Sequence, residues 1–104
     1  TETCVTFADG MACRAPWEEP VAIISRGAAR VVRVSDDAIA EAIRVLYEDT
    51  HNLAEGAGAA SLAALLAEGP AGRRPGKAAM ILCGGNIDRE WFGEILAGRT
   101  PVPS

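Results

Sequence analysis

One stretch of this sequence limits its folding more than any other, the alanine- and glycine-rich run between residues 55 and 68. Its letters are EGAGAASLAALLAE, and between Ala57 and Ala67 no residue is charged and only Ser61 has a polar side chain. A helix that is apolar on every side is buried on several sides. A chain of 104 residues has little room to bury such a helix. We therefore expect this helix to need partner structure that lies outside the chain.

Apolar spacing predicts three further helices. One covers residues 17–27 and ends at Gly27, and another covers residues 37–49 with its apolar side chains at helical intervals. Ser35 and Asp36 are candidates for the N-cap of that second helix, and Arg44 and Glu48 can pair across one turn of it. The last helix starts after Asp88 and ends at Gly98, and its apolar stripe is formed by Trp91, Phe92, Ile95 and Leu96.

Two short segments have the composition of strands. Residues 29–34 contain three β-branched valines, and residues 78–82 form an apolar run that suggests a buried strand. A loop rich in Gly and Pro is expected over residues 69–76. The order strand, helix, helix, strand, helix predicts an α/β fold with a parallel sheet. Two strands alone make a poor sheet, so the chain is expected to be a fragment.

Composition excludes several classes of function. Ten Lys and Arg against fourteen Asp and Glu give a net charge of −4, which argues against a nucleic-acid partner. No apolar run approaches the ~20 residues that span a bilayer, and no signal peptide is visible, so no membrane partner is expected. Three cysteines and one histidine lack the spacing of a disulfide scaffold or a zinc site. A cytoplasmic protein with reduced thiols and no metal is the prediction.

Two places could carry chemistry. The turn Cys83-Gly84-Gly85-Asn86 follows a predicted strand, and ligands of parallel sheets bind beyond the carboxyl ends of strands. The alternative for this turn is a tight connection with a buried, inert cysteine. Glu55 is the single charge that leads into the apolar helix, where the helix dipole favours an acid. The alternative for Glu55 is an ordinary N-terminal acid beside closely packed glycines.

Four motifs in order resemble one enzyme family. They are Thr6-Phe7-Ala8-Asp9-Gly10-Met11-Ala12, Val34-Ser35-Asp36-Asp37-Ala38-Ile39, Glu55-Gly56-Ala57-Gly58-Ala59-Ala60 and Leu82-Cys83-Gly84-Gly85-Asn86-Ile87-Asp88. Together they resemble the threonine/serine dehydratases, which are pyridoxal-phosphate enzymes of the tryptophan-synthase-β-like fold, fold type II. The resemblance covers roughly residues 1–101. It implies that residues 1–104 are the C-terminal part of a catalytic domain whose N-terminal part is absent, with few strands and several helices.

The resemblance also implies roles for individual residues. Cys83 takes the position that faces the pyridine nitrogen of the cofactor, and Gly84 lines the ring. Gly10, in the family's Ala-Asp-Gly motif, is a candidate backbone contact, and Glu55 matches the family's acid near the ring. A neutral thiol does not hold the pyridine nitrogen protonated as an aspartate would, so the ring is a weaker electron sink. That property suits β-elimination.

The chain departs from the family pattern in some places. Many relatives have Ser at the position of Cys83 and Pro at the position of Gly56, although Cys and Gly also occur there. The family's Schiff-base lysine, its phosphate-binding loop and its usual metal ligands all lie upstream of Thr1. Lys77 is the only lysine, and it lies in a Gly/Pro loop without the Ser-x-Lys context. No catalytic residue is therefore assigned, and the chain alone is predicted to be inactive.

The resemblance implies a lyase, threonine ammonia-lyase. The intact enzyme would take an amino acid as its substrate and convert L-threonine to 2-oxobutanoate and ammonia by β-elimination. It would bind pyridoxal phosphate, pair this chain with the missing N-terminal part and form a homo-oligomer. Two alternatives remain open. One is a serine racemase or hydroxyaspartate dehydratase of the same fold, and the other is a non-catalytic α/β binding module.

Overall fold

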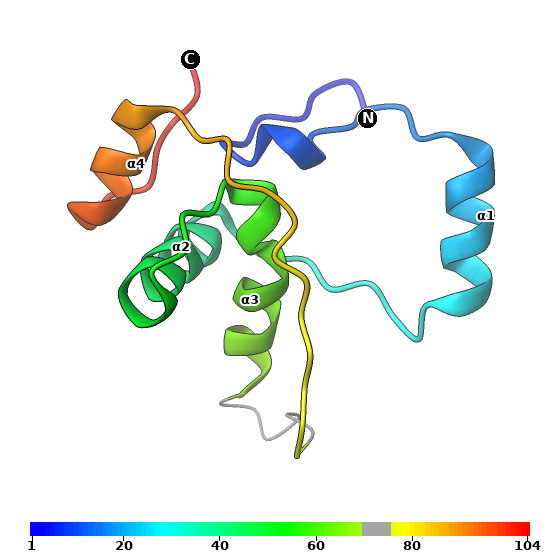
Figure 1. Cartoon of the computed structure of the whole chain (residues 1–104). Helices are drawn as coiled ribbons and strands as arrows, with labels where there is room; N and C mark the ends of the chain where they lie inside the picture. Colours follow the sequence, from blue (N-terminus) through cyan, green and yellow to red (C-terminus); the bar gives the residue numbers. More distant parts are fainter. Residues whose placement is uncertain (70–75) are drawn as a thin grey trace.

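The computed structural model describes residues 1–69 and 76–104. Their elements, in chain order, are a short 3-10 helix η1 (Asp9–Met11) and the α-helices α1 (Glu18–Gly27), α2 (Asp36–Thr50), α3 (Gly56–Glu68) and α4 (Arg89–Leu96) (Figure 1). The four predicted helices are confirmed, with ends within about two residues of those expected. Most of the predicted Gly/Pro loop lies outside the described residues.

The core lies between α2 and α3, which run side by side, and α4 covers the other side of α2 (Figure 1). Both helices contribute apolar side chains that are almost wholly buried, such as Ile43 and Leu62. Phe7 and Ile95 complete this core, and the Phe7 ring meets that of Trp91 edge to face at 6.3 Å. The core is small because one side of α3 carries little more than alanine and glycine, which bury little area.

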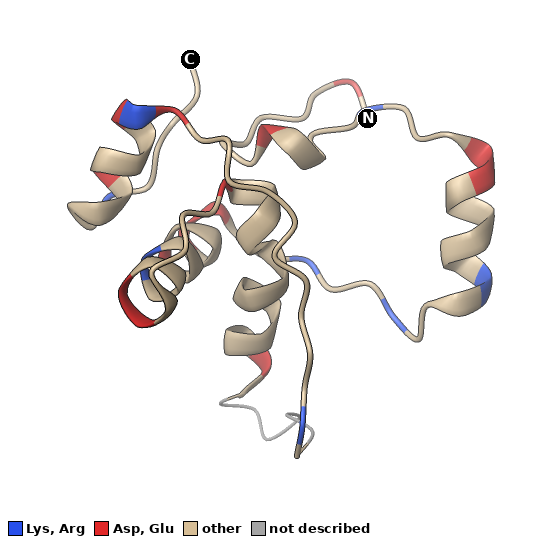
Figure 2. Cartoon of the chain, viewed as in Figure 1, with Lys and Arg blue, Asp and Glu red and all other residues tan. Residues whose placement is uncertain are grey.

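Helix α3 is only partly buried. Figure 2 shows its ribbon without charge apart from its last turn. The residues that it buries are Gly56, Gly58, Ala59, Leu62 and Ala63. Its remaining side chains are half-buried or exposed, and Ser61 and Ala67 are among the exposed ones. That this helix needs more structure around it stays a prediction.

Side-chain hydrogen bonds cap the start of α2 and connect this helix to α4. The Ser35 hydroxyl accepts from the Ala38 N–H at 3.1 Å, so the predicted N-cap is confirmed. The predicted pair of Arg44 with Glu48 is wrong, because Arg44 donates to Glu41 at 2.6 Å. Arg44 also donates to the Ile95 carbonyl at 3.0 Å, and that contact turns the guanidinium toward α4.

Both end segments of the chain are attached to the first turn of α2. The Thr6 hydroxyl donates to the Asp36 carboxylate at 2.5 Å, and the Thr100 hydroxyl donates to the Asp37 carboxylate at the same distance. Pro101, next to Thr100, is fully buried. Two neighbouring aspartates therefore join segments from opposite ends of the sequence.

The predicted parallel sheet is not confirmed. No residue within 1–69 and 76–104 lies in a strand, although the segments 29–34 and 78–82 follow open, extended paths in Figure 1. A strand is held by hydrogen bonds to a neighbouring strand, and neither segment has such a neighbour among the described residues. Most of their side chains are exposed as well, with 79% of the surface accessible at Val31 and at Ile81, whereas Val34 is half-buried against the core. The expectation of a buried strand at residues 78–82 is therefore wrong for the chain by itself.

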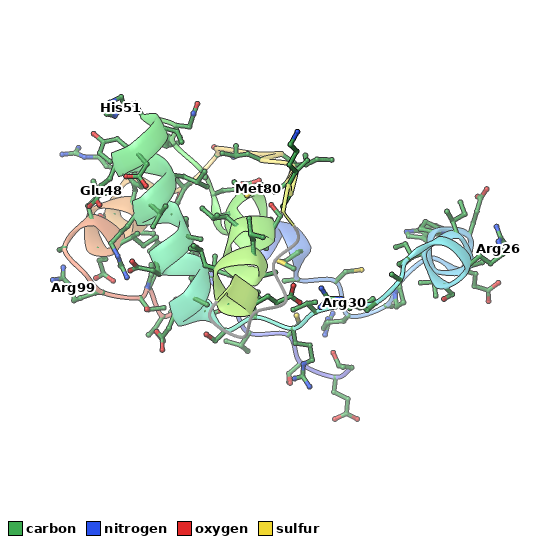
Figure 3. All side chains as sticks on the ribbon, turned by 90° about the horizontal axis from the view of Figure 1, so that it is seen from below. Arg26, Arg30, Glu48, His51, Met80 and Arg99 are labelled. Carbon is green, nitrogen blue, oxygen red and sulfur yellow. The ribbon has the colours of Figure 1, made fainter. Side chains whose placement is uncertain are left out.

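Helix α1 stands away from the rest of the molecule. Figure 3 shows it from its end, with Arg26 on it, separate from the other helices. None of its residues is buried, and the apolar side chains of Val21, Ile23 and Ile24 are exposed. Its amphipathic pattern predicts the helix correctly. The apolar side chains of this helix, however, have no packing partner in the described part of the chain. None of the described helices is long and apolar enough to cross a membrane.

Candidate functional site

The first turn of α3 is the meeting point of three segments that are far apart in the sequence. The 3-10 helix η1 lies against α3, and the Glu55 N–H donates to the Gly84 carbonyl at 3.0 Å. Gly56 is packed so closely against Ala8 that a Cβ at residue 56 would lie 2.7 Å from the Ala8 Cα. Residues 7–10, 53–58 and 83–86 therefore form one site.

Three of the four predicted cofactor residues lie together in this site. The Glu55 carboxylate lies against Gly84, in the space that a Cβ of residue 84 would fill. The same carboxylate faces Gly10, where an added Cβ would be 3.7 Å from Oε1 and 3.1 Å from the Cβ of Ala57. Glu55 thus lies between the two glycines whose backbones are predicted to contact the cofactor. Its position at the start of a helix also places it where the helix dipole favours a negative charge.

Cys83, the fourth predicted residue, precedes Gly84 directly. Its side chain is exposed, and its Sγ forms no hydrogen bond with another described residue. The alternative of a buried, inert cysteine therefore does not hold for this chain. An exposed thiol beside a glycine turn is accessible to a ligand as a weak hydrogen-bond donor.

Two further glycines belong to the site although they are not among the predicted cofactor residues. A Cβ on Gly58 would overlap the Gly84 carbonyl oxygen and lie 3.0 Å from the Gly84 nitrogen. A Cβ on Gly85 would lie 2.6 Å from the Leu53 carbonyl oxygen. Both contacts are with backbone, which cannot rotate away as a side chain does. The expectation of closely packed glycines beside Glu55 anticipates tight packing at Gly58, but it does not name the backbone that Gly58 meets.

A small cavity opens beside the site. Its volume is about 100 Å³, and it is lined by Phe7, Asp9, Glu55, Gly56, Asn86, Ile87, Asp88 and Trp91. Cofactor pockets usually measure ~300–1,000 Å³, so this cavity is too small to hold one. A larger hollow of about 620 Å³ lies at the start of α4 and shares Asp88 and Trp91 with the cavity, but none of the predicted cofactor residues lines it. Of the predicted cofactor residues, Glu55 lines the smaller cavity, Gly10 and Cys83 are exposed, and Gly84 is half-buried.

Other polar residues lie apart from the site. Lys77 is exposed and lies at the start of the extended segment whose other end is Cys83. Six residues of extended chain span roughly 20 Å, so its amine is far from the glycine turn. His51 ends α2 in a left-handed conformation, with φ of 58°. Among residues 1–69 and 76–104, no group of three or more His, Cys, Asp or Glu side chains is placed to hold a metal ion.

Known proteins resemble this chain over most of its length. The family described as pyridoxal-phosphate dependent enzyme matches residues 1–84. An L-threonine ammonia-lyase of Geobacter sulfurreducens is 45% identical over 105 residues, which cover 91% of this chain and 25% of that protein. An L-threonine ammonia-lyase of Thermotoga maritima is 34% identical over 91 residues, which cover 88% of this chain and 22% of that protein. The chain thus spans about a quarter of the length of these curated relatives. No solved structure matches it.

Proposed function

The chain belongs to the pyridoxal-phosphate-dependent enzyme family, whose characteristic sequence it matches over residues 1–84, and from this premise we propose that it is part of an ammonia-lyase acting on L-threonine. The observation that carries the proposal is the meeting of Gly10, Glu55 and Gly84 at the first turn of α3. The substrate is proposed from the names of the relatives. The reaction would be β-elimination, with 2-oxobutanoate and ammonia as products.

The residues of the site fit pyridoxal phosphate in two respects. Gly10 is exposed and Gly84 is half-buried, so backbone without a side chain can meet a flat ring on the sides of these glycines that Glu55 does not cover. The exposed Cys83 thiol can donate a hydrogen bond to the pyridine nitrogen. When bound, the cofactor supplies the electron sink that β-elimination needs.

Each residue has a separate part in this proposal. Cys83 is a neutral donor, so it orients the ring without placing a full positive charge on it. Glu55 holds the glycine turn through its N–H on the Gly84 carbonyl. Its carboxylate presents negative charge beside both glycines. The basic group that removes the Cα proton is not assigned to this chain, because Lys77 lies at the far end of the extended segment.

We also propose that the two extended segments are strands of a parallel sheet in a longer enzyme. A groove of about 530 Å³ between them is lined by Arg30 and Val32 on one side and by Met80 and Ile81 on the other, with α3 as its floor. Apolar side chains along both walls are exposed, which favours burial by further strands. The relatives are about four times as long as the chain, so they contain enough residues to supply such strands.

A chimeric enzyme tests the function directly. The segment of the Geobacter sulfurreducens relative that aligns with this chain is replaced by residues 1–104, and the chimera is assayed for 2-oxobutanoate formed from L-threonine. We expect cofactor binding and threonine deamination. A control chimera with Gly10→Val, Glu55→Ala and Gly84→Val should fold, as judged by circular dichroism, but bind pyridoxal phosphate poorly.

The outcomes separate the alternatives. A chimera that folds and binds the cofactor but acts only on serine or hydroxyaspartate contradicts the substrate. A folded chimera that binds no cofactor contradicts the function and favours a non-catalytic module. Amide exchange tests the sheet, because the amides of residues 31–34 and 79–82 should exchange rapidly in the chain alone and slowly in the chimera.

A further inference from the structure

The single polar side chain in the apolar part of α3 has a specific partner. The Ser61 hydroxyl donates to the Ile81 carbonyl at 2.8 Å. Ser61 is exposed, and no charged residue lies nearby on its helix. The hydrogen bond therefore attaches the extended segment to α3 at a position where the sequence pattern alone indicates only a solvent-facing serine.

A second attachment lies at the start of the helix. The Glu55 N–H binds the Gly84 carbonyl at 3.0 Å, and Gly58 gives that carbonyl room to lie against the helix. Residues three apart lie on one face of a helix. Residues 55, 58 and 61 therefore form one edge of α3, which contacts the extended segment at both ends.

The two attachments fix how the segment is aligned with the helix. Ser61 meets Ile81 and Gly58 meets Gly84, so three residues of helix are matched by three residues of extended chain running in the opposite direction. Alternate side chains of an extended segment point to opposite faces, and a slip by one residue exchanges the faces. Cys83 lies between the two attachments, so this alignment determines to which face of the extended segment its thiol points.

We propose that Gly58 and Ser61 are positioning residues that set the register of residues 81–84 on α3, and so decide on which face Cys83 presents its thiol. The register follows from the contacts of this chain alone. Only the statement that the thiol meets the cofactor rests on the proposed function. Gly58 acts by leaving room for the Gly84 carbonyl, and Ser61 acts by binding the Ile81 carbonyl.

The first experiment measures the register in the chain itself by amide hydrogen exchange, detected by NMR. Gly58→Ala pushes on backbone, so the Glu55 amide should exchange about ten times faster, the factor expected when one hydrogen bond of this kind is lost. The matched control is Gly93→Ala in α4, where an added Cβ meets nothing within 4 Å. Gly93→Ala should leave the Glu55 amide unchanged. Equal exchange in the Gly58→Ala variant and the unsubstituted chain overturns the proposal for Gly58.

The second experiment measures the affinity of the chimera for pyridoxal phosphate. Ser61→Ala removes one neutral hydrogen bond, so the affinity should fall about fivefold. Ser61→Thr keeps the hydroxyl and should restore the affinity to within about twofold. In a Cys83→Ala background, Ser61→Ala should have almost no further effect, because the residue through which it acts is gone.

The results distinguish this proposal from the proposed function. If Ser61→Ala weakens the affinity equally with and without Cys83, Ser61 serves stability alone and the proposal is overturned. Failure of Ser61→Thr to restore the affinity also overturns it. If the unsubstituted chimera binds no cofactor, the proposed function fails, and the exchange measurement then decides the register by itself.

Discussion

The carboxylate of Glu55 lies against the Cα of Gly84, in the space that a methyl group at residue 84 would fill. The backbones of the same two residues are joined by the hydrogen bond from the Glu55 N–H to the Gly84 carbonyl. The absence of a side chain at position 84 thus leaves room for a neighbouring carboxylate. An acid and a glycine that the sequence separates by a helix and a loop form one unit in the structure.

Gly84→Ala should displace the Glu55 carboxylate with little loss of stability. The clash is with the end of a flexible side chain, so the free energy of unfolding should fall by less than about 1 kcal/mol. The affinity of the chimera for pyridoxal phosphate should fall clearly, because the added methyl group would displace the Glu55 carboxylate from its place beside both glycines. Thermal unfolding of the chain and cofactor titration of the chimera measure the two effects. Gly76→Ala, which adds a Cβ in open space, is the control.

Gly58→Ala should destabilise the chain, although alanine is the better helix former. The added Cβ would overlap backbone at Gly84, and such overpacking costs about 1–3 kcal/mol. Gly93→Ala meets no neighbour within 4 Å, so it should stabilise the chain by up to about 1 kcal/mol through helix propensity. Urea unfolding of both variants gives the comparison. Stabilisation by both substitutions would show that the Gly58 contact is absent in solution.

Substitutions of Cys83 in the chimera should separate a cofactor contact from a packing role. Cys83→Ser keeps a donor and should retain much of the activity, whereas Cys83→Ala should weaken cofactor binding. Cys83→Asp should shift the balance from elimination toward side reactions such as racemisation, since a carboxylate favours a protonated ring. Kinetics and cofactor affinity are measured, with circular dichroism as the folding control. Full activity and unchanged cofactor affinity in Cys83→Ala would rule out the contact.

Ile43→Ala should be among the most damaging single changes to the core. Ile43 is fully buried between α2 and its neighbours, and removal of such a side chain costs about 2–5 kcal/mol. Ile23 on α1 is 56% exposed, so Ile23→Ala should change the free energy of unfolding by no more than about 0.5 kcal/mol. Denaturant unfolding of the two variants tests the assignment of the core. Similar losses for both would mean that α1 packs against the rest in solution.

The ion pair between Arg30 and Glu68 should contribute no pH dependence in the neutral to alkaline range. The hydrogen bond that the Arg30 guanidinium donates to Glu68, followed by the charge of Glu68, raises the pKa of that guanidinium above its ordinary value. A raised pKa means that the contribution is present below the unfolded-state value and is lost only as the pH rises through the folded-state value. Both lie at strongly alkaline pH. The difference in unfolding midpoint between the chain and its Arg30→Gln variant should therefore stay constant from about pH 7 to pH 10.

The helices could be predicted from the sequence because their signals are local. Ser35 as a cap and the helical spacing of Ile39 and Ile43 are read within one or two turns of chain. Strands depend on a partner that local sequence does not contain. The valines of residues 29–34 favour an extended path, and the chain adopts that path, but it supplies no neighbouring strand among the described residues. The parallel sheet therefore stays a prediction for a longer protein.

Only those residues of the candidate site that lie in a sequence motif could be predicted. Gly10, Glu55 and Gly84 each lie in a quoted motif, and the structure brings them together. Gly58 also lies in a quoted motif and Ser61 directly follows that motif, but the pattern does not show which groups these two residues contact. Their contacts are with carbonyl groups of residues 81 and 84, which no side-chain pattern encodes. Backbone contacts of this kind become visible only in three dimensions.

The attachment of Thr6 and Thr100 to neighbouring aspartates has a practical consequence for shortening this chain. A truncation that removes either threonine takes away the partner of a carboxylate in the first turn of α2. Truncations at the two ends are therefore not independent, because each of them removes a hydrogen bond from the first turn of α2. Crystallisation variants that keep residues 6–101 retain both attachments and the buried Pro101.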